Sequence, residues 1–94
     1  MIIPITKVHV APIESTGRIR AMCSVTLGDA FVVHGVRIID SSKGLFVSMP
    51  QRKDGDQYAD VAHPITADLR ARLSSAVLEA YQETQGGVTD DLDP

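Results

Sequence analysis

Residues 18–39 read RIRAMCSVTLGDAFVVHGVRII, and this stretch decides the fold. In its first ten residues polar and apolar side chains alternate, which is typical of a strand with one buried face and one polar face. The pair Gly28-Asp29 then favours a tight reversal of the chain. The run from Phe31 to Ile39 is rich in Val and Ile and predicts a second strand. The stretch is therefore expected to form an antiparallel hairpin.

Further strands are expected on both sides of this hairpin. Residues 2–10 show partial alternation, and Pro4 indicates an edge position or a late start of the strand. On the C-terminal side we expect a short strand, an exposed polar loop and a last short strand, over residues 45–49, 51–57 and 58–62. The sequence thus predicts about five antiparallel strands.

A helix is the clearest element of the C-terminal part. Thr66 is a good N-cap, and Asp68 falls in the first turn, where the helix dipole favours an anion. One apolar stripe recurs at helical spacing and comprises Leu69, Leu73, Ala76, Val77, Ala80 and Tyr81. Gly86-Gly87 ends the helix.

These elements predict an α+β fold, a small antiparallel β-sheet followed by one C-terminal α-helix. The helix is expected to cover the apolar face of its own sheet or of a partner's sheet. Residues 1–85 are predicted to form one domain. Residues 86–94 are predicted to be an acidic, disordered tail.

The composition is that of one small globular domain. The chain has 94 residues, of which 44% are hydrophobic and 22% charged. A chain of this length buries one core with little stability to spare, which favours a homodimer. The single Cys23 excludes an intrachain disulfide and is expected to be a small buried hydrophobe. Because neither a signal peptide nor a membrane-spanning apolar run is apparent, we expect a cytoplasmic protein without membrane insertion.

The sequence shows no pattern typical of a catalytic or metal site. His9, His34 and His63 fall on separate predicted strands, and none has the spacing of a zinc ligand. The sequence also lacks a nucleophile elbow, a P-loop and a dinucleotide-binding loop. We therefore expect no enzyme activity, no metal and no cofactor. His63 precedes Pro64 and is expected to bond to backbone where the chain enters the helix.

The basic residues are the one group of side chains in the sequence that indicates a function. Residues 1–72 contain all nine Lys and Arg against seven Asp and Glu, whereas residues 73–94 contain five acidic residues and no basic one. The isoelectric point near 5.4 argues against generic charge-driven binding of nucleic acid but allows a local basic patch. Three pairs stand out: Arg18 and Arg20, Arg52 and Lys53, Arg70 and Arg72. The alternative is that these side chains solvate the surface and pair with Asp68 or Asp60.

Segments spread along the chain resemble the stage V sporulation protein G (SpoVG) family. Their order and spacing agree with those of the family. They are ITKV (residues 5–8), GRIRA (17–21), FVVHGVRIIDSSKGLFVSMPQRK (31–53), DVAHPI (60–65) and VLEAY (77–81). The part after Tyr81 matches no family pattern. The resemblance implies a small homodimeric protein linked to septation and cell division and, in spore formers, to sporulation.

The resemblance also implies a regulator that binds DNA or RNA. The implied contact region is the positive surface near the helix start and the MPQRK segment. In this sequence that region corresponds to Arg52, Lys53, Arg70 and Arg72. Arg18 and Arg20 are the weaker candidates. An alternative stays open, in which the protein docks on the division machinery through a sheet edge or helix face and binds no nucleic acid.

Overall fold

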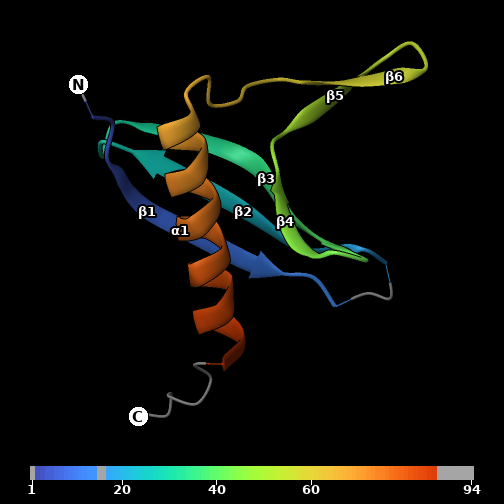
Figure 1. The fold of residues 1–94 in the computed structure, drawn as a ribbon, viewed down its shortest axis with the longest axis horizontal. Coiled ribbons are helices and arrows are strands. Elements are labelled where there is room, and N and C mark those ends of the chain that lie inside the picture. Colours follow the sequence, from blue (N-terminus) through green and yellow to red (C-terminus); the bar gives the residue numbers. More distant parts are fainter. Residues whose placement is uncertain (1, 15–16, 87–94) are drawn as a thin grey trace.

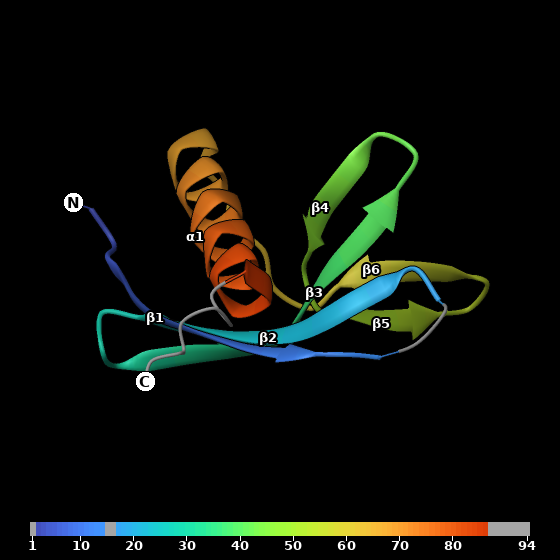
Figure 2. The ribbon, with the colours of Figure 1, turned by 90° about the horizontal axis from the view of Figure 1, so that it is seen from below.

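The computed structural model describes residues 2–14 and 17–86. Within them it forms β1 (Ile5–Pro12), β2 (Ile19–Leu27), β3 (Phe31–Ser41), β4 (Gly44–Ser48), β5 (Gln51–Asp54), β6 (Gln57–Asp60) and α1 (Ala67–Gly86). The first four strands form an antiparallel sheet in the order β1-β2-β3-β4, and β5 pairs with β6 in a separate sheet. α1 covers one face of the larger sheet, against β1, β2 and β4 (Figures 1 and 2). The predicted α+β fold is confirmed, and the helix lies on its own sheet.

The hairpin between β2 and β3 forms where the sequence predicts it. Gly28 and Asp29 both have positive φ, +57° and +55°, as a tight turn between twisted strands requires. The N–H of Ala30 donates to the carbonyl of Leu27 at 3.0 Å. The ladder begins with Leu27 opposite Phe31, so Ala30 adds one residue to the expected two-residue link.

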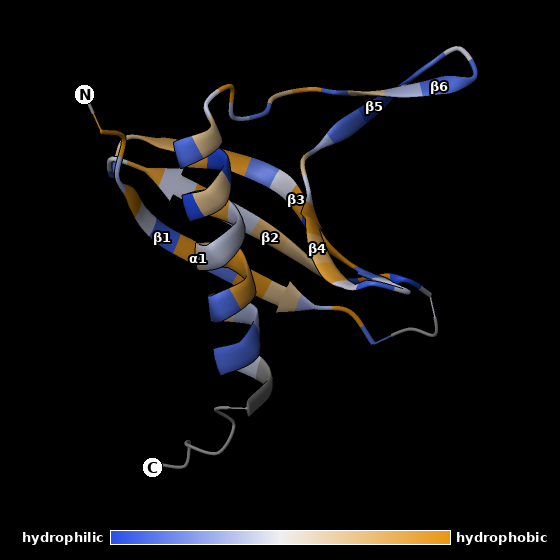
Figure 3. Ribbon diagram, in the orientation of Figure 1, coloured by the Kyte–Doolittle hydropathy of each residue, from blue (hydrophilic) through white to orange (hydrophobic). Residues whose placement is uncertain are grey.

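The core lies between the sheet and the helix. The buried side chains there are Ala21, Cys23, Val25, Val36, Ile38, Leu73 and Val77. The three from β2 are every second residue, and the two from α1 are one turn apart, so both predicted apolar faces are confirmed. Figure 3 shows the hydrophobic colour of β2 and β4 beside the mainly hydrophilic β5. Burial of each larger side chain stabilises the fold by about 1.5–3 kcal/mol.

Side chains fix the point at which the chain enters α1. The N–H of Leu69 donates to Oγ1 of Thr66 at 3.2 Å, which confirms the predicted N-cap. Nδ1 of His63 donates to the carbonyl of Pro64 at 3.1 Å, so the predicted backbone bond of this histidine is also present.

The prediction of an exposed loop over residues 51–57 is wrong, and the described residues contain six strands instead of about five. β5 and β6 form a hairpin around Gly55, whose φ is +66°. Both faces of this hairpin carry polar side chains, so hydrophobic alternation does not reveal it. It extends away from the rest of the molecule, and its strands pack mainly on each other (Figure 1). We call residues 51–60 the arm.

The two ends of the described chain agree with the sequence in part. β1 begins after Pro4 and lies at the sheet edge, as that proline predicts, but continues to Pro12. α1 ends at Gly86, and the rest of the predicted tail, residues 87–94, lies outside the described residues. In the described part of the chain, no helix is long and apolar enough to cross a membrane.

Candidate nucleic-acid interface

The arm carries Arg52 and Lys53, and both side chains are exposed. Arg52 lies opposite Ala59 in the ladder, and Lys53 lies opposite Tyr58. Ladder partners share a face and consecutive residues alternate, so the two cations are on opposite faces of the arm. Among the residues that the structure describes, neither cation has a hydrogen bond or an ion pair.

The face that holds Lys53 combines a cation with an aromatic ring. Tyr58, its cross-strand neighbour, is 67% exposed. An ammonium group binds phosphate, and an exposed ring stacks on a nucleobase. The other face carries Arg52, which lies opposite Ala59 and so has no aromatic neighbour across the ladder. We call the first surface the Lys53 face, which consists of Gln51, Lys53, Tyr58 and Asp60.

A chain of hydrogen bonds fixes the arm to the larger sheet. Nη2 of Arg37 on β3 donates to Oγ of Ser48 at 3.0 Å and to Oε1 of Gln51 at 3.2 Å. Nε2 of Gln51 in turn donates to Oδ1 of Asp60 at 3.0 Å. Sequence reasoning missed Arg37, because a single cation in an alternating strand gives no signal of its partners.

Arg70 and Arg72, at the start of α1, form bonds within the fold. Nη2 of Arg70 donates to the carbonyl of Pro64 at 3.1 Å. Arg72 forms an ion pair with Asp68, Nε to Oδ2 at 3.0 Å, and Nη1 donates to the carbonyl of Ile3 at 2.9 Å. Asp68 is one of the two partners considered from the sequence, so for Arg72 the surface-pairing alternative holds.

Arg18 and Arg20 share a partner near the end of β3. Nε of Arg18 donates to the carbonyl of Asp40 at 3.1 Å, and Nη2 of Arg20 lies 3.0 Å from Oδ2 of the same residue. The start of β2 and the start of α1 lie at opposite ends of the sheet (Figure 1). The six predicted site residues therefore form three groups and not one patch.

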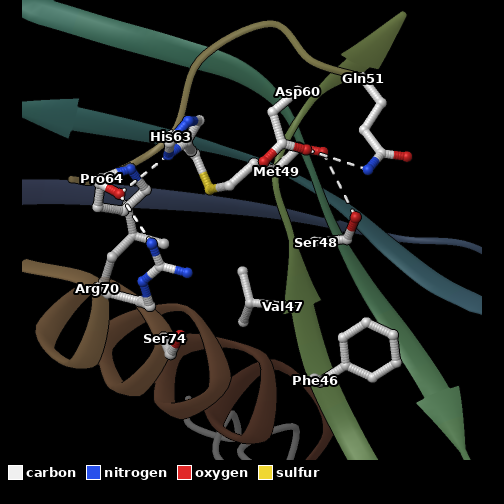
Figure 4. Close-up of a pocket in the computed structure, with 11 residues that line it drawn as sticks. Phe46, Val47, Ser48, Met49, Gln51, Asp60, His63, Pro64, Arg70 and Ser74 are labelled. Atoms are coloured by element: carbon white, nitrogen blue, oxygen red, sulfur yellow. Dashed lines mark hydrogen bonds between the residues drawn. The ribbon is translucent and has the colours of Figure 1, made fainter. Parts of the chain in front are cut away.

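An open cavity of about 290 Å³ lies where β4, the arm and the start of α1 meet (Figure 4). Asp60 and Arg70 contribute polar groups to its wall, and Val47 and Leu73 contribute apolar surface. This cavity brings Arg70 to the root of the arm. It also brings together two of the segments on which the family resemblance rests, residues 31–53 and 60–65.

Ser24, His34 and Cys23 carry further groups of a kind used in catalysis. Oγ of Ser24 and Nδ1 of His34 are 2.8 Å apart as cross-strand neighbours. In the described residues no carboxylate orients this imidazole, and no three His, Cys, Asp or Glu side chains are grouped to hold a metal ion. Cys23 is buried, as expected, and burial raises the pKa of its thiol.

Comparison with known proteins adds to this geometry. The family model described as SpoVG matches residues 3–83. Similar proteins carry the name "Putative septation protein SpoVG". The one from Staphylococcus carnosus is 42% identical over 92% of this chain and 81% of its own length. The one from Lachnospira eligens is 46% identical over 86% of this chain and 93% of its own length. The one from Staphylococcus aureus strain Newman is 41% identical over 92% of this chain and 87% of its own length. Because these matches span most of every chain, this protein belongs to the SpoVG family.

Proposed function

We propose that this protein is a DNA- or RNA-binding regulator of the SpoVG type that acts in septation and cell division and, in spore formers, in sporulation. The observation that carries the proposal is the Lys53 face of the arm. There an exposed ammonium group with no partner in the described residues lies beside the exposed ring of Tyr58. This combination suits a single strand, whose phosphate and base present both complementary groups. The proposed role is binding and not catalysis.

The charges of the arm limit how the protein binds. Residues 51–60 contain two cations and three carboxylates, and the whole chain is acidic. Few phosphates are therefore neutralised, and the affinity depends only moderately on salt. Contacts to bases then carry a larger share of the binding, which favours sequence-selective recognition.

We further propose that the functional unit is a homodimer in the cytoplasm. A two-stranded hairpin is only marginally stable on its own, and the arm packs on little of its own chain. Large apolar side chains are also exposed beside the core: Phe31 is 64% exposed, Val61 61% and Ile65 86%. Contact between two copies covers such surface and doubles the number of arms available to a strand.

The edges of the larger sheet favour a second candidate function, docking on a protein of the division machinery without nucleic-acid binding. Within the described residues, β1 and β4 each have one unpaired edge in the four-stranded sheet. A free edge accepts an added strand from a partner protein.

Selection from random pools of single-stranded RNA and double-stranded DNA, at near-physiological salt, separates the two candidates. The proposal expects enriched sequences that bind the parent protein and bind the Tyr58→Ala variant more weakly. Gln57→Ala is the matched control, since residue 57 belongs to the other face of the same arm. Recovery of no enriched sequence, together with stable capture of a division protein, supports docking and refutes nucleic-acid binding.

A further inference from the structure

We propose that the cavity at the root of the arm binds one unpaired guanine base of a single strand, an inference that rests on the proposed nucleic-acid binding. The cavity measures about 290 Å³, close to the smallest ligand pockets, which start at about 300 Å³. It is open on one side, so a base can enter while its sugar and phosphate stay outside. Its size therefore suits a single base more than a larger ligand.

The wall of the cavity offers the two surfaces that a base needs. Val47, Met49 and Leu73 supply apolar contact for the ring faces. Asp60 and Arg70 supply polar groups from β6 and α1 (Figure 4). Unpaired bases in proteins are held in this way, by stacking and by hydrogen bonds to their Watson–Crick edge.

Asp60 selects the base. An ionised carboxylate only accepts hydrogen bonds. Guanine presents two adjacent donors, N1–H and the N2 amino group, which match the two carboxylate oxygens. Adenine, cytosine and uracil each place an acceptor beside their donor, and that acceptor repels the carboxylate. The remaining acceptor of guanine, O6, is complementary to a guanidinium such as that of Arg70.

Both polar groups are oriented before a ligand arrives. The link from Arg37 through Gln51 holds Oδ1 of Asp60 at 3.0 Å from Nε2 of Gln51. In the described part of the chain, Oδ2 of Asp60 has no protein partner. Arg70 is fixed by one bond to the carbonyl of Pro64, and Nε and Nη1 of its guanidinium form no bond to a described residue.

The cavity continues the Lys53 face of the arm. Asp60 and Tyr58 lie two residues apart on the same face of β6, which is about 7 Å along the strand. Consecutive nucleotides of an extended single strand are separated by a similar distance. One base stacked on Tyr58 therefore places the next at the cavity, while Lys53 contacts the connecting phosphate.

The test uses short oligoadenylate RNAs in which one central position is G, A, C or U. Fluorescence anisotropy at near-physiological salt should show the parent protein binding the G strand about five to ten times more tightly than the others, the selectivity expected of one bidentate contact. Asp60→Asn replaces an acceptor by a donor at similar shape and should abolish this preference, so that the variant binds the four strands with equal affinity. Asp56→Asn is the matched control, because it makes the same charge change in the turn at the arm tip and should keep the preference.

Methyl NMR of Val47 and Leu73 locates the base. The proposal expects their signals to shift with the G strand and to remain unchanged in Asp60→Asn. Equal affinity for all four strands refutes the guanine site but leaves the proposed function intact if the strands still bind the arm. A preference that survives in Asp60→Asn, or contacts from a second copy to these methyls in the free protein, also refutes it. Absence of binding to any strand refutes both the site and the proposed function.

Discussion

Gly35 of β3 lies so close to Pro50 that a Cβ atom built at position 35 would be 3.2 Å from the Cβ of the proline. Gly35 has a φ of +84°, and the ladder between β2 and β3 shifts by one residue beside it. Only glycine meets both conditions without strain. The bulge at Gly35 therefore makes room for the segment that leads from β4 into the arm.

Replacement of Gly35 by Ala should destabilise the protein by about 2–4 kcal/mol, because backbone strain and overpacking act together. Gly28→Ala is the matched control: its φ is +57°, but a Cβ there meets no atom within 4 Å. It should cost only about 1–2 kcal/mol. Urea unfolding measures both. Equal losses in the two variants would show that the contact with Pro50 does not matter.

Leu73→Ala should lower the free energy of unfolding by about 2–5 kcal/mol. The side chain is only 4% exposed and packs in the core with Val77. Gln82→Ala, an exposed position on the same helix, is the control and should change stability by no more than about 0.5 kcal/mol. A similarly small loss for Leu73→Ala would mean that the helix face is not packed on the sheet and is open to a partner.

The sequence predicts those elements whose signal is local. The alternation around Cys23 and the stripe through Leu73 each reflect one buried face, so β2 and α1 follow directly. The arm gives no such signal, because it has no buried face and depends on ladder bonds and its turn. The partners of Arg70 and Arg72 were only partly predictable. Asp68 is one helical turn from Arg72, but the carbonyls that both arginines bind are positioned by the fold.

Cys23 should make stability depend on pH in the alkaline range. Burial raises the pKa of its thiol above the ordinary value of 9.0. As pH rises, the thiol ionises in the unfolded chain at a lower pH than in the folded protein. Its contribution to the free energy of unfolding is therefore fully present below the ordinary pKa and is lost as pH rises through the pKa of the folded state. Urea unfolding of the parent and of Cys23→Ala, which cannot ionise, isolates this effect from other groups. The stability difference between them should be constant near neutral pH and shrink above about pH 9. A stability difference between parent and variant that does not change with pH would contradict this prediction.

The protein should sediment at micromolar concentration with about twice the monomer mass of 10.1 kDa. Val61→Asp should shift it toward the monomer, because a charge then replaces an exposed apolar side chain next to the arm. Gln57→Asp adds the same charge at an exposed polar position of the arm and should leave the mass unchanged. A monomer mass for the parent protein would refute the proposed homodimer.

Replacement of Arg52 and Lys53 by Ala should leave the melting temperature nearly unchanged, because exposed charges contribute little to stability. It should weaken oligonucleotide binding and flatten the slope of log affinity against log salt by about one unit for each phosphate that the variant no longer neutralises. Lys43→Ala, in the turn between β3 and β4, removes one charge away from the arm and serves as the control.

The single variants distinguish the two faces of the arm. Lys53→Ala should weaken binding more than Arg52→Ala, because Lys53 lies opposite Tyr58 in the ladder, whereas Arg52 lies opposite Ala59. In a two-fold dimer each substitution counts twice if both arms contact the strand. Unchanged affinity and an unchanged salt slope in the double variant would exclude the arm as the contact site. The two cations would then serve only to solvate the surface.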